Sequence, residues 1–414
     1  MLKLQNTMTR EKETFTPRDD RIVRMFTCGP SIYRRPHVGN YRTFTWEDAL
    51  QRYLEYKGYD VRRVINLTDV EDKAIEEAEQ HALKVGELTR SVAERFEEES
   101  RLLRIRLPEK IPRASTSIEQ SVYLIRRLLD SGHAYSHNGD IFFDPLKFGG
   151  FGKLYRLDMS KWPKQRRRFK KDTYPGQRWN LGDFILWHAY KGGDGVYWDT
   201  EIGKGRPSWN IQDPAMISEN LGYELDIFCG GIDNLVRHHD YNIAVMESVS
   251  GKELSRYWLH GEHVLSQGRK MSKSLNNEVF PEDLLTEGFS WQHIRYYLLS
   301  RHYRKKLNLT IESFRSRCQR LDTLRSQVGD ILNGQSGTKT AGDEKVKELT
   351  AGITSGFQEC MDNDLDTRAG IDGVEEVVSE LHRLGTAGKI GKAEAVRIGE
   401  VLRKVDSVLQ VIFK

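Results

Sequence analysis

The sequence predicts an α/β protein: a Rossmann-like parallel sheet, interrupted by an inserted α+β subdomain and followed by a C-terminal helical bundle. Three observations predict it. β-branched runs alternate with helical patterns near the amino terminus, the alternation stops over 111–205, and the chain is helical in pattern after residue 276. A length of 414 residues allows two or three domains with a substantial core.

The first half of the Rossmann-like domain is expected over 1–110. Its first twenty residues are polar and predict a short hairpin or arm. The strand and helix patterns that follow indicate a parallel sheet, because strands alternate with helices. The predicted elements are a strand at 25–30 that runs into a tight turn, a helix at 41–56, a strand at 61–67 and a helical segment from residue 69.

Residues 111–205 are expected to form a subdomain inserted between the two halves of the sheet. A helical pattern at 115–131 precedes short aromatic strands at 141–143 and 197–198. A basic run at 161–171 interleaves lysines and arginines with aromatic residues, which suits contacts to phosphates and bases. The alternative is a solvated loop, since most charge runs are only solvated.

Residues 206–275 are expected to complete the sheet, and the rest of the chain is expected to be helical. The predicted elements of the second half are a strand at 224–228, a turn at 230–233, a helix at 238–249, strands at 257–259 and 264–265, and a turn at 266–268. Beyond it we expect a connecting helical domain at 276–333 with helices at 292–300 and 311–331, a Gly/Ser/Thr-rich linker at 334–344, and a bundle at 345–414 with helices at 345–361, 367–384 and 392–412.

Composition excludes several classes of protein. Charged residues make up 30% of the chain and the formal net charge is only +4, so the broad basic field of a dedicated nucleic-acid binder is missing. Four unpatterned cysteines argue against a disulfide framework. No apolar run approaches a membrane span and the first ten residues lack a signal-peptide core, so we expect a cytoplasmic protein without a membrane partner.

Two segments carry residues suited to a nucleotide. The loop at 270–274, Lys-Met-Ser-Lys-Ser, places two lysines where they can stabilise a triphosphate as pyrophosphate leaves, although a solvated loop is the alternative for this segment alone. At the start of the helix predicted at 41–56, His37 can donate to a phosphate oxygen and Gly39 allows close approach of a nucleotide. Free backbone N–H groups at a helix start also bind phosphate.

These two segments, in this order, resemble the His-Ile-Gly-His and Lys-Met-Ser-Lys-Ser motifs of class I aminoacyl-tRNA synthetases. Further motifs resemble the cysteinyl-tRNA synthetase family: Phe-Thr-Cys-Gly-Pro-Ser-Ile-Tyr at 26–33, Asn-Leu-Thr-Asp-Val-Glu-Asp-Lys at 66–73, Gly-Arg-Pro-Ser-Trp at 205–209, Asp-Ile at 226–227, Gly-Gly at 230–231, His-His at 238–239 and Ser-Arg-His-Tyr-Arg-Lys-Lys-Leu-Asn at 300–308. The resemblance runs from about residue 4 to the carboxyl terminus and also covers the mycothiol ligases, which join cysteine to an amino sugar.

The resemblance implies a class I synthetase fold and an ATP-dependent ligase that forms an aminoacyl-adenylate, with Mg²⁺ at the phosphates. Positioning and electrostatics drive such a reaction, without a covalent enzyme intermediate. The residues expected to stabilise the transition state are His37, Asn40, Lys270 and Lys273, where Asn40 replaces the family's second His. Those expected to bind ATP or the adenylate are Gly29, Ser31, Gly39, Thr43, Gly231, Asp233, Val264 and Ser272.

The resemblance also implies an amino-acid pocket, formed by Cys28, Asn66, Thr68, Trp209, Asp213 and His238. The family selects cysteine through a zinc ion, held by two Cys, one His and one Glu, that binds the substrate thiolate. Cys28 and His238 match this set, whereas Asp213 and Asn242 replace the second Cys and the Glu. Zinc binding therefore stays open and cysteine is not assured. Asp213 either pairs with a hydrogen-bonding or cationic substrate or is satisfied locally.

Three functions follow from these substitutions. The first is a divergent paralogue that transfers the aminoacyl group to a small amine or carrier acceptor, or to a tRNA with reduced anticodon contact, because the family's anticodon-contacting extension is expected to be absent. The second is a true cysteine–tRNA ligase with a modified zinc site. The third is a catalytically reduced paralogue that binds RNA or regulates. The Glu-Arg-Gly-Gly-Asp-Pro segment typical of mycothiol ligases is missing.

Overall fold

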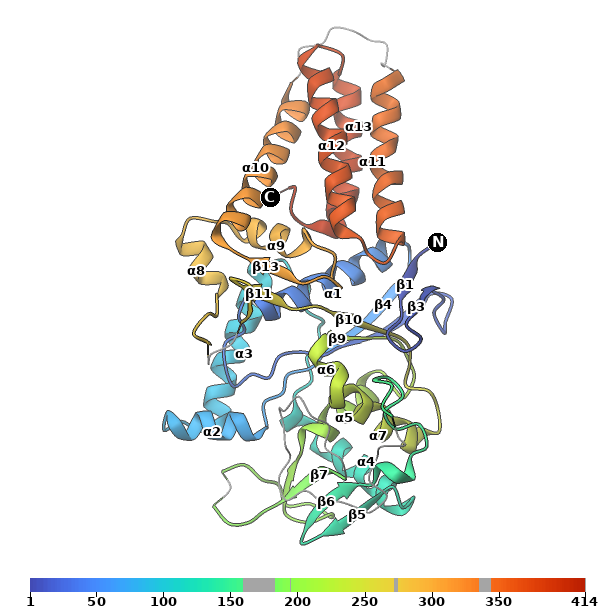
Figure 1. Cartoon of the computed structure of the whole chain (residues 1–414), viewed down its shortest axis with the longest axis vertical. Helices are drawn as coiled ribbons and strands as arrows, with labels where there is room; N and C mark the ends of the chain where they lie inside the picture. The colour runs from blue at the N-terminus through green and yellow to red at the C-terminus, as the bar shows by residue number, and fades with distance from the viewer. Residues whose placement is uncertain (159–182, 194, 272–274, 335–343, 414) are drawn as a thin grey trace.

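The predicted α/β architecture is confirmed by the structure, a computed structural model that describes residues 1–158, 183–193, 195–271, 275–334 and 344–413. A parallel sheet occupies the middle of the molecule, an antiparallel sheet lies at one end and a helical bundle at the other (Figure 1). The basic run at 161–171, Ser272, Lys273 and residues 335–343 of the predicted linker lie outside the described residues.

The central sheet has the strand order β10-β9-β3-β4, and all three pairings are parallel. Its strands are β3 (Ile22–Thr27), β4 (Asp60–Ile65), β9 (Leu225–Gly231) and β10 (Ser255–Gly261). The first half of the chain extends the sheet from β3 to β4, and the second half extends it in the opposite direction through β9 and β10. Such a reversal opens a crevice at the carboxyl ends of the strands, where ligands bind in α/β sheets.

Helix α1 (Val38–Tyr56) follows β3 and connects the sheet to the helical bundle (Figure 1). It contacts β4 and β9 on one side and the helices α9 and α13 on the other, so its side chains are buried nearly all round. Trp46, Leu50 and Tyr53 join the sheet and the bundle in one apolar cluster. Because α1 is held on both sides, its first turn has a fixed position at the crevice.

The inserted segment forms a second, antiparallel sheet with the order β5-β6-β7-β8. Stacked rings of Phe184 and Tyr241, with centroids 4.0 Å apart, connect this sheet to α7. The helices α4, α5 and α7 pack against one another beside it, so α5 and α7 lie between the two sheets. Before the inserted segment come α2 (Asp72–Gln80) and α3 (Val85–Leu102). The antiparallel sheet and the helices beside it are α4 (Ile118–Asp130), β5 (Ala134–His137), β6 (Asp140–Phe143), β7 (Phe184–Ala189), β8 (Gly205–Pro207), α5 (Trp209–Asn220) and, after β9, α7 (Asp240–Ser250).

The loop that carries Lys270 begins with a tight hairpin. Strands β11 (Val264–Ser266) and β12 (Arg269–Lys270) pair antiparallel around Gln267 and Gly268, both of which have a positive φ (52° and 76°). Two residues of this conformation form the turn that matches the twist of a two-stranded ribbon. Strand β13 (Leu307–Leu309) pairs in parallel with β11 and holds the hairpin to the helical part of the chain.

The remaining helices confirm the predicted elements to within a few residues. They are α9 (Trp291–Leu299), α10 (Ile311–Asn333), α11 (Glu344–Asp362), α12 (Thr367–Thr386) and α13 (Lys392–Leu409), whereas the short helix α8 (Pro281–Thr286) was not predicted. The predicted amino-terminal hairpin is also present, as β1 (Lys3–Gln5) and β2 (Lys12–Thr14). Buried Asp364, between α11 and α12, joins the bundle to the loop after α9 and to this hairpin. It accepts hydrogen bonds from Tyr303 Oη and from the backbone N–H of Gln5. Among the described helices, none combines the length and apolar character that a membrane span requires.

Three predicted elements differ from the structure. The turn expected at 230–233 is wrong, because β9 continues through Gly231, where it pairs with β10, and α6 (Ile232–Asn234) begins directly after it. The first two residues of the predicted helix at 238–249 belong to a π-helical turn, Leu235–His239, and α7 begins at Asp240. The strand expected at 197–198 is reduced to a single bridge between Trp198 and Gly205. Glycine and aromatic content cannot reveal which strand pairs with which neighbour.

Candidate active site

A cleft of about 390 Å³ opens at the carboxyl edge of the parallel sheet. Its walls are the loops that follow β3, β4 and β9, the first turns of α1 and the start of α5. The structure brings most of the predicted site residues together here: Cys28, Gly29, Ser31, His37, Asn40, Thr43, Asn66, Thr68, Trp209, Asp213, Gly231, Asp233 and His238 all line the cleft. The crevice predicted from the strand order is therefore where these residues meet.

The other described residues of the prediction lie around the cleft without lining it. Lys270 reaches the rim, where its Nζ lies 3.4 Å from Asp233 Oδ2. Gly39 lies against the His37 ring, since a Cβ at this glycine would be 2.7 Å from His37 Cε1. Val264 is buried in β11. Asn242 is buried in α7 and contacts Asp213, which belongs to α5.

His37 stands directly before α1 and is set up as a neutral hydrogen-bond donor. Its backbone N–H donates to Asn40 Oδ1 at 3.0 Å, so the amide NH₂ of Asn40 remains the group that can donate to a ligand. Burial, with a smaller contribution from the nearby Lys270, lowers the pKa of His37 to about 4. At neutral pH the ring is therefore an uncharged imidazole.

A chain of hydrogen bonds leads from the β3 loop to the floor of the cleft. The backbone N–H of Gly29 donates to Asn66 Oδ1 at 2.9 Å, and Asn66 Nδ2 donates to Asp213 Oδ1, also at 2.9 Å. A Cβ at Gly29 would lie 1.7 Å from the carbonyl oxygen of Asn66, so this close approach requires glycine. The Asn66 side chain therefore links the backbone of the β3 loop to the Asp213 carboxylate.

Asp213 is the centre of the amino-acid end of the cleft. Its Oδ2 contacts His238 Nε2 at 2.7 Å, Asn242 Nδ2 at 3.3 Å and Cys28 Sγ at 3.5 Å. All four side chains are buried, with exposed fractions between 0% and 7%. Burial, and then the neighbouring Asp213 carboxylate, raises the pKa of the Cys28 thiol well above its ordinary value, so the thiol is protonated and donates. The His238 ring stacks on Trp209, with centroids 3.7 Å apart.

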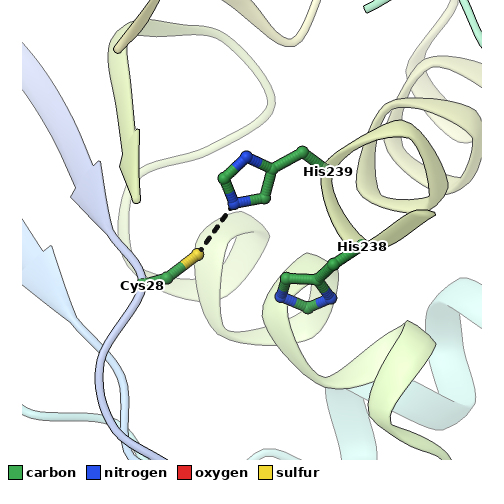
Figure 2. Close-up of side chains that lie close together, drawn as sticks. All are labelled: Cys28, His238 and His239. Carbon is green, nitrogen blue, oxygen red and sulfur yellow. Dashed lines mark hydrogen bonds between the residues drawn. The ribbon is translucent and has the colours of Figure 1, made fainter. Parts of the chain in front are cut away.

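The sequence did not assign a role to His239, although the His-His pair was one of the motifs. Figure 2 shows His239 reaching Cys28 Sγ, at 3.2 Å from its Nε2, with His238 beside them. Its Nδ1 lies 2.8 Å from His260 Nε2, and burial lowers the pKa of His260 to about 3. Other lining residues that sequence reasoning missed are Tyr33, Arg34, Arg35, Pro36, Phe44, Lys73, Asn234, Glu278 and Pro30.

The strand order, with a cleft at the carboxyl edge of the sheet, gives the chain the fold of the class I aminoacyl-tRNA synthetases. The fold is similar to that of Mycobacterium tuberculosis methionyl-tRNA synthetase in complex with methionyl-adenylate, with a TM-score of 0.67 and 16% identity over 95% of this chain and 90% of that one. At this identity the likeness concerns the fold alone. The match supports the predicted parallel-sheet architecture.

The family follows from closer relatives. Residues 14–319 match the family model described as tRNA synthetases class I (C) catalytic domain. A Chlamydia pneumoniae protein named "Cysteine--tRNA ligase" is 39% identical over 99% of this chain and 86% of its own length. A protein of the same name from Solibacter usitatus (strain Ellin6076) is 36% identical over 99% of this chain and 87% of its own length. The chain belongs to the cysteinyl-tRNA synthetase family of ATP-dependent, amino-acid-activating ligases, as the motifs predicted.

The residues present do not fit the zinc site of this family. Asp213 Oδ2 and His238 Nε2 are 2.7 Å apart, which is a hydrogen-bond distance, whereas two tetrahedral ligands about 2.0–2.1 Å from one zinc ion lie roughly 3.3 Å apart. Asn242 directs its amide NH₂ to Asp213 in place of a carboxylate ligand. A different trio, Cys28, His238 and His239, has ligand atoms within 4.8 Å of one another. Both nitrogens of His239 already contact Cys28 or His260.

Proposed function

We propose that this chain activates an amino acid with ATP and transfers the aminoacyl group to the 3′ end of a tRNA. One observation carries the proposal: a single cleft contains both the helix start at His37 and the pocket around Asp213. A substrate carboxylate held between them can attack the α-phosphorus of ATP and release pyrophosphate. A ribose hydroxyl of the tRNA then attacks the carbonyl carbon and releases AMP. Holding the reacting groups in one cleft supplies much of the rate enhancement.

At the nucleotide end, the proposed groups act on charge that develops as pyrophosphate leaves. The neutral His37 ring and the amide NH₂ of Asn40 donate to phosphate oxygens, and Lys270 adds positive charge from the rim. Lys273, outside the described residues, is proposed to do the same. Mg²⁺, expected for this chemistry, would screen the phosphates.

Asp233 is proposed to accept hydrogen bonds from the ribose hydroxyls. Its present partner is Lys270, and both side chains are more than half exposed, at 56% and 58%. Exposed pairs of this kind contribute little to stability, typically about 0–1 kcal/mol. ATP can therefore separate the pair at small cost, which releases Lys270 for the phosphates.

The choice of tRNA as acceptor rests on the relatives named above, both of which are named for a tRNA. The small amine or carrier acceptor, the first of the three expected functions, has no support among them. The basic run at 161–171 suits a nucleic acid in composition. The proposal thus combines the family's acceptor with an altered amino-acid pocket.

ATP–pyrophosphate exchange across a panel of amino acids, followed by tRNA charging with the best of them, tests this function. We expect exchange with at least one amino acid and charging of a tRNA. Exchange without charging would reject the tRNA acceptor and favour the small amine. If no amino acid supports exchange, the activation chemistry itself is wrong and the chain is a binding or regulatory paralogue.

A further inference from the structure

At the four zinc positions, the side chains of Cys28, His238 and Asn242 all contact the fourth, Asp213. A carboxylate offers about four lone-pair positions. Asp213 accepts from Asn66 on Oδ1, and its Oδ2 lies 2.7 Å from His238 Nε2, 3.3 Å from Asn242 Nδ2 and 3.5 Å from Cys28 Sγ. Each donor is itself buried, so none of these contacts competes with bulk water. The charge of Asp213 is therefore stabilised inside the protein and requires neither a metal ion nor a cationic substrate.

Two acceptor atoms next to this network have no hydrogen-bond partner within the described part of the chain: His238 Nδ1 and Asn242 Oδ1. In the neutral tautomer that donates from Nε2 to Asp213, the other ring nitrogen of His238 carries a lone pair and accepts. His238 lines the cleft and stacks on Trp209, which fixes the plane of its ring. A donor on a substrate side chain would satisfy such an atom.

We propose that this chain selects its amino acid without a metal, by hydrogen bonding a small neutral side chain that carries one donor, a thiol or a hydroxyl, at His238 beside Asp213. This inference rests on the proposed function and adds the substrate class. A pocket built on hydrogen bonds rejects an analogue that lacks the donor, because the buried acceptor is then left unpaired. It separates thiol from hydroxyl far less sharply than a zinc ion does, since zinc binds a thiolate and scarcely binds a neutral hydroxyl.

The test compares the wild type with the double variant D213C/N242E, which restores the family's set of two Cys, one His and one Glu. The matched control is D60C/N333E, which makes the same two exchanges at exposed positions, away from the cleft. Zinc affinity is measured by competition with a chromogenic chelator, and zinc content by mass spectrometry of the purified full chain. Circular dichroism and thermal melting verify that each variant is folded.

We expect no stoichiometric zinc in the wild type or the control, and one zinc per chain in D213C/N242E. In exchange assays the wild type should activate cysteine and serine within about tenfold of each other and alanine at least about 10²-fold more slowly. In the double variant the preference for cysteine over serine should rise by about 10²-fold or more. If the double variant does not fold, the wild-type zinc content and the cysteine, serine and alanine rates still decide.

One zinc per chain in the wild type, whether through Cys28, Asp213 and His238 or through Cys28, His238 and His239, would overturn the inference. So would alanine activation equal to that of serine and cysteine. Exchange together with a bound zinc would overturn this inference alone, whereas a lack of exchange with every amino acid would overturn the proposed function.

Discussion

The two ends of the cleft differ in what they keep from the family. At the nucleotide end, His37, Gly39 and the loop that begins at Lys270 follow the family motifs, with Val38 for Ile and Asn40 for the second His as replacements. At the amino-acid end, two of the family's four zinc ligands are replaced. The two that are retained, Cys28 and His238, contact Asp213. Because different residues line the two ends of the cleft, we expect phosphate chemistry and side-chain selection to respond to different substitutions.

The largest expected effect is at the nucleotide end. Replacing His37 with alanine removes a donor to the developing phosphate charge and should lower the rate of ATP–pyrophosphate exchange by about 10²–10³-fold. The KM for the amino acid should change little, because the ring is at the other end of the cleft. H137A, at an exposed position on β5, is the control. Exchange at the wild-type rate in H37A would remove His37 from the catalytic group.

A smaller effect is expected at the amino-acid end. In D213N the buried carboxylate is lost, and hydrogen bonds to charged groups contribute about 1.5–3 kcal/mol each. The KM for the amino acid should therefore rise by roughly 10–10²-fold, with little change in the KM for ATP. D60N on the surface is the matched control. An equal rise in both KM values would mean that the two ends are not separable.

The link between the ends is tested through Gly29. A Cβ at this position would meet the Asn66 carbonyl oxygen at 1.7 Å, so G29A should lower the free energy of unfolding by about 1–3 kcal/mol. The control is G86A in α3, where a Cβ meets nothing within 4 Å and alanine is the better helix former. Denaturant unfolding followed by circular dichroism measures both. Equal stability of G29A and wild type would contradict the close approach.

The smallest expected effect concerns pH. The pKa of His37 falls from an ordinary 6.5 to about 4 on folding, so between these values the unfolded chain binds the proton first. Stability from the neutral ring is fully present above about pH 6.5 and is lost as the pH falls towards 4. Between pH 6 and 5 the wild type should lose about 1 kcal/mol more than H37N. Parallel stability–pH curves for the two proteins would argue against the lowered pKa.

Local patterns predicted most of the fold, and motifs predicted where the cleft residues would come from. Helices α1 and α9–α13 follow from apolar periodicity, which is a local property of the chain. The extension of β9 through Gly231 depends on pairing with β10, which periodicity does not show. The sequence leaves open whether Asp213 pairs with a substrate or with other side chains of the protein. Sequence patterns cannot decide this, because the side chains that contact Asp213 come from distant segments, after β3, after β4 and in the region of α7. The contact of His239 with Cys28 joins positions 211 residues apart.

The most direct measurement is pyrophosphate exchange by the wild-type protein after zinc is removed with 1,10-phenanthroline, with Mg²⁺ and ATP supplied in excess. A side-chain pocket built on Asp213 and His238 predicts that the preferred amino acid is activated at the same rate before and after treatment, and that added zinc changes nothing. Loss of exchange on treatment, with recovery on addition of zinc, would contradict it.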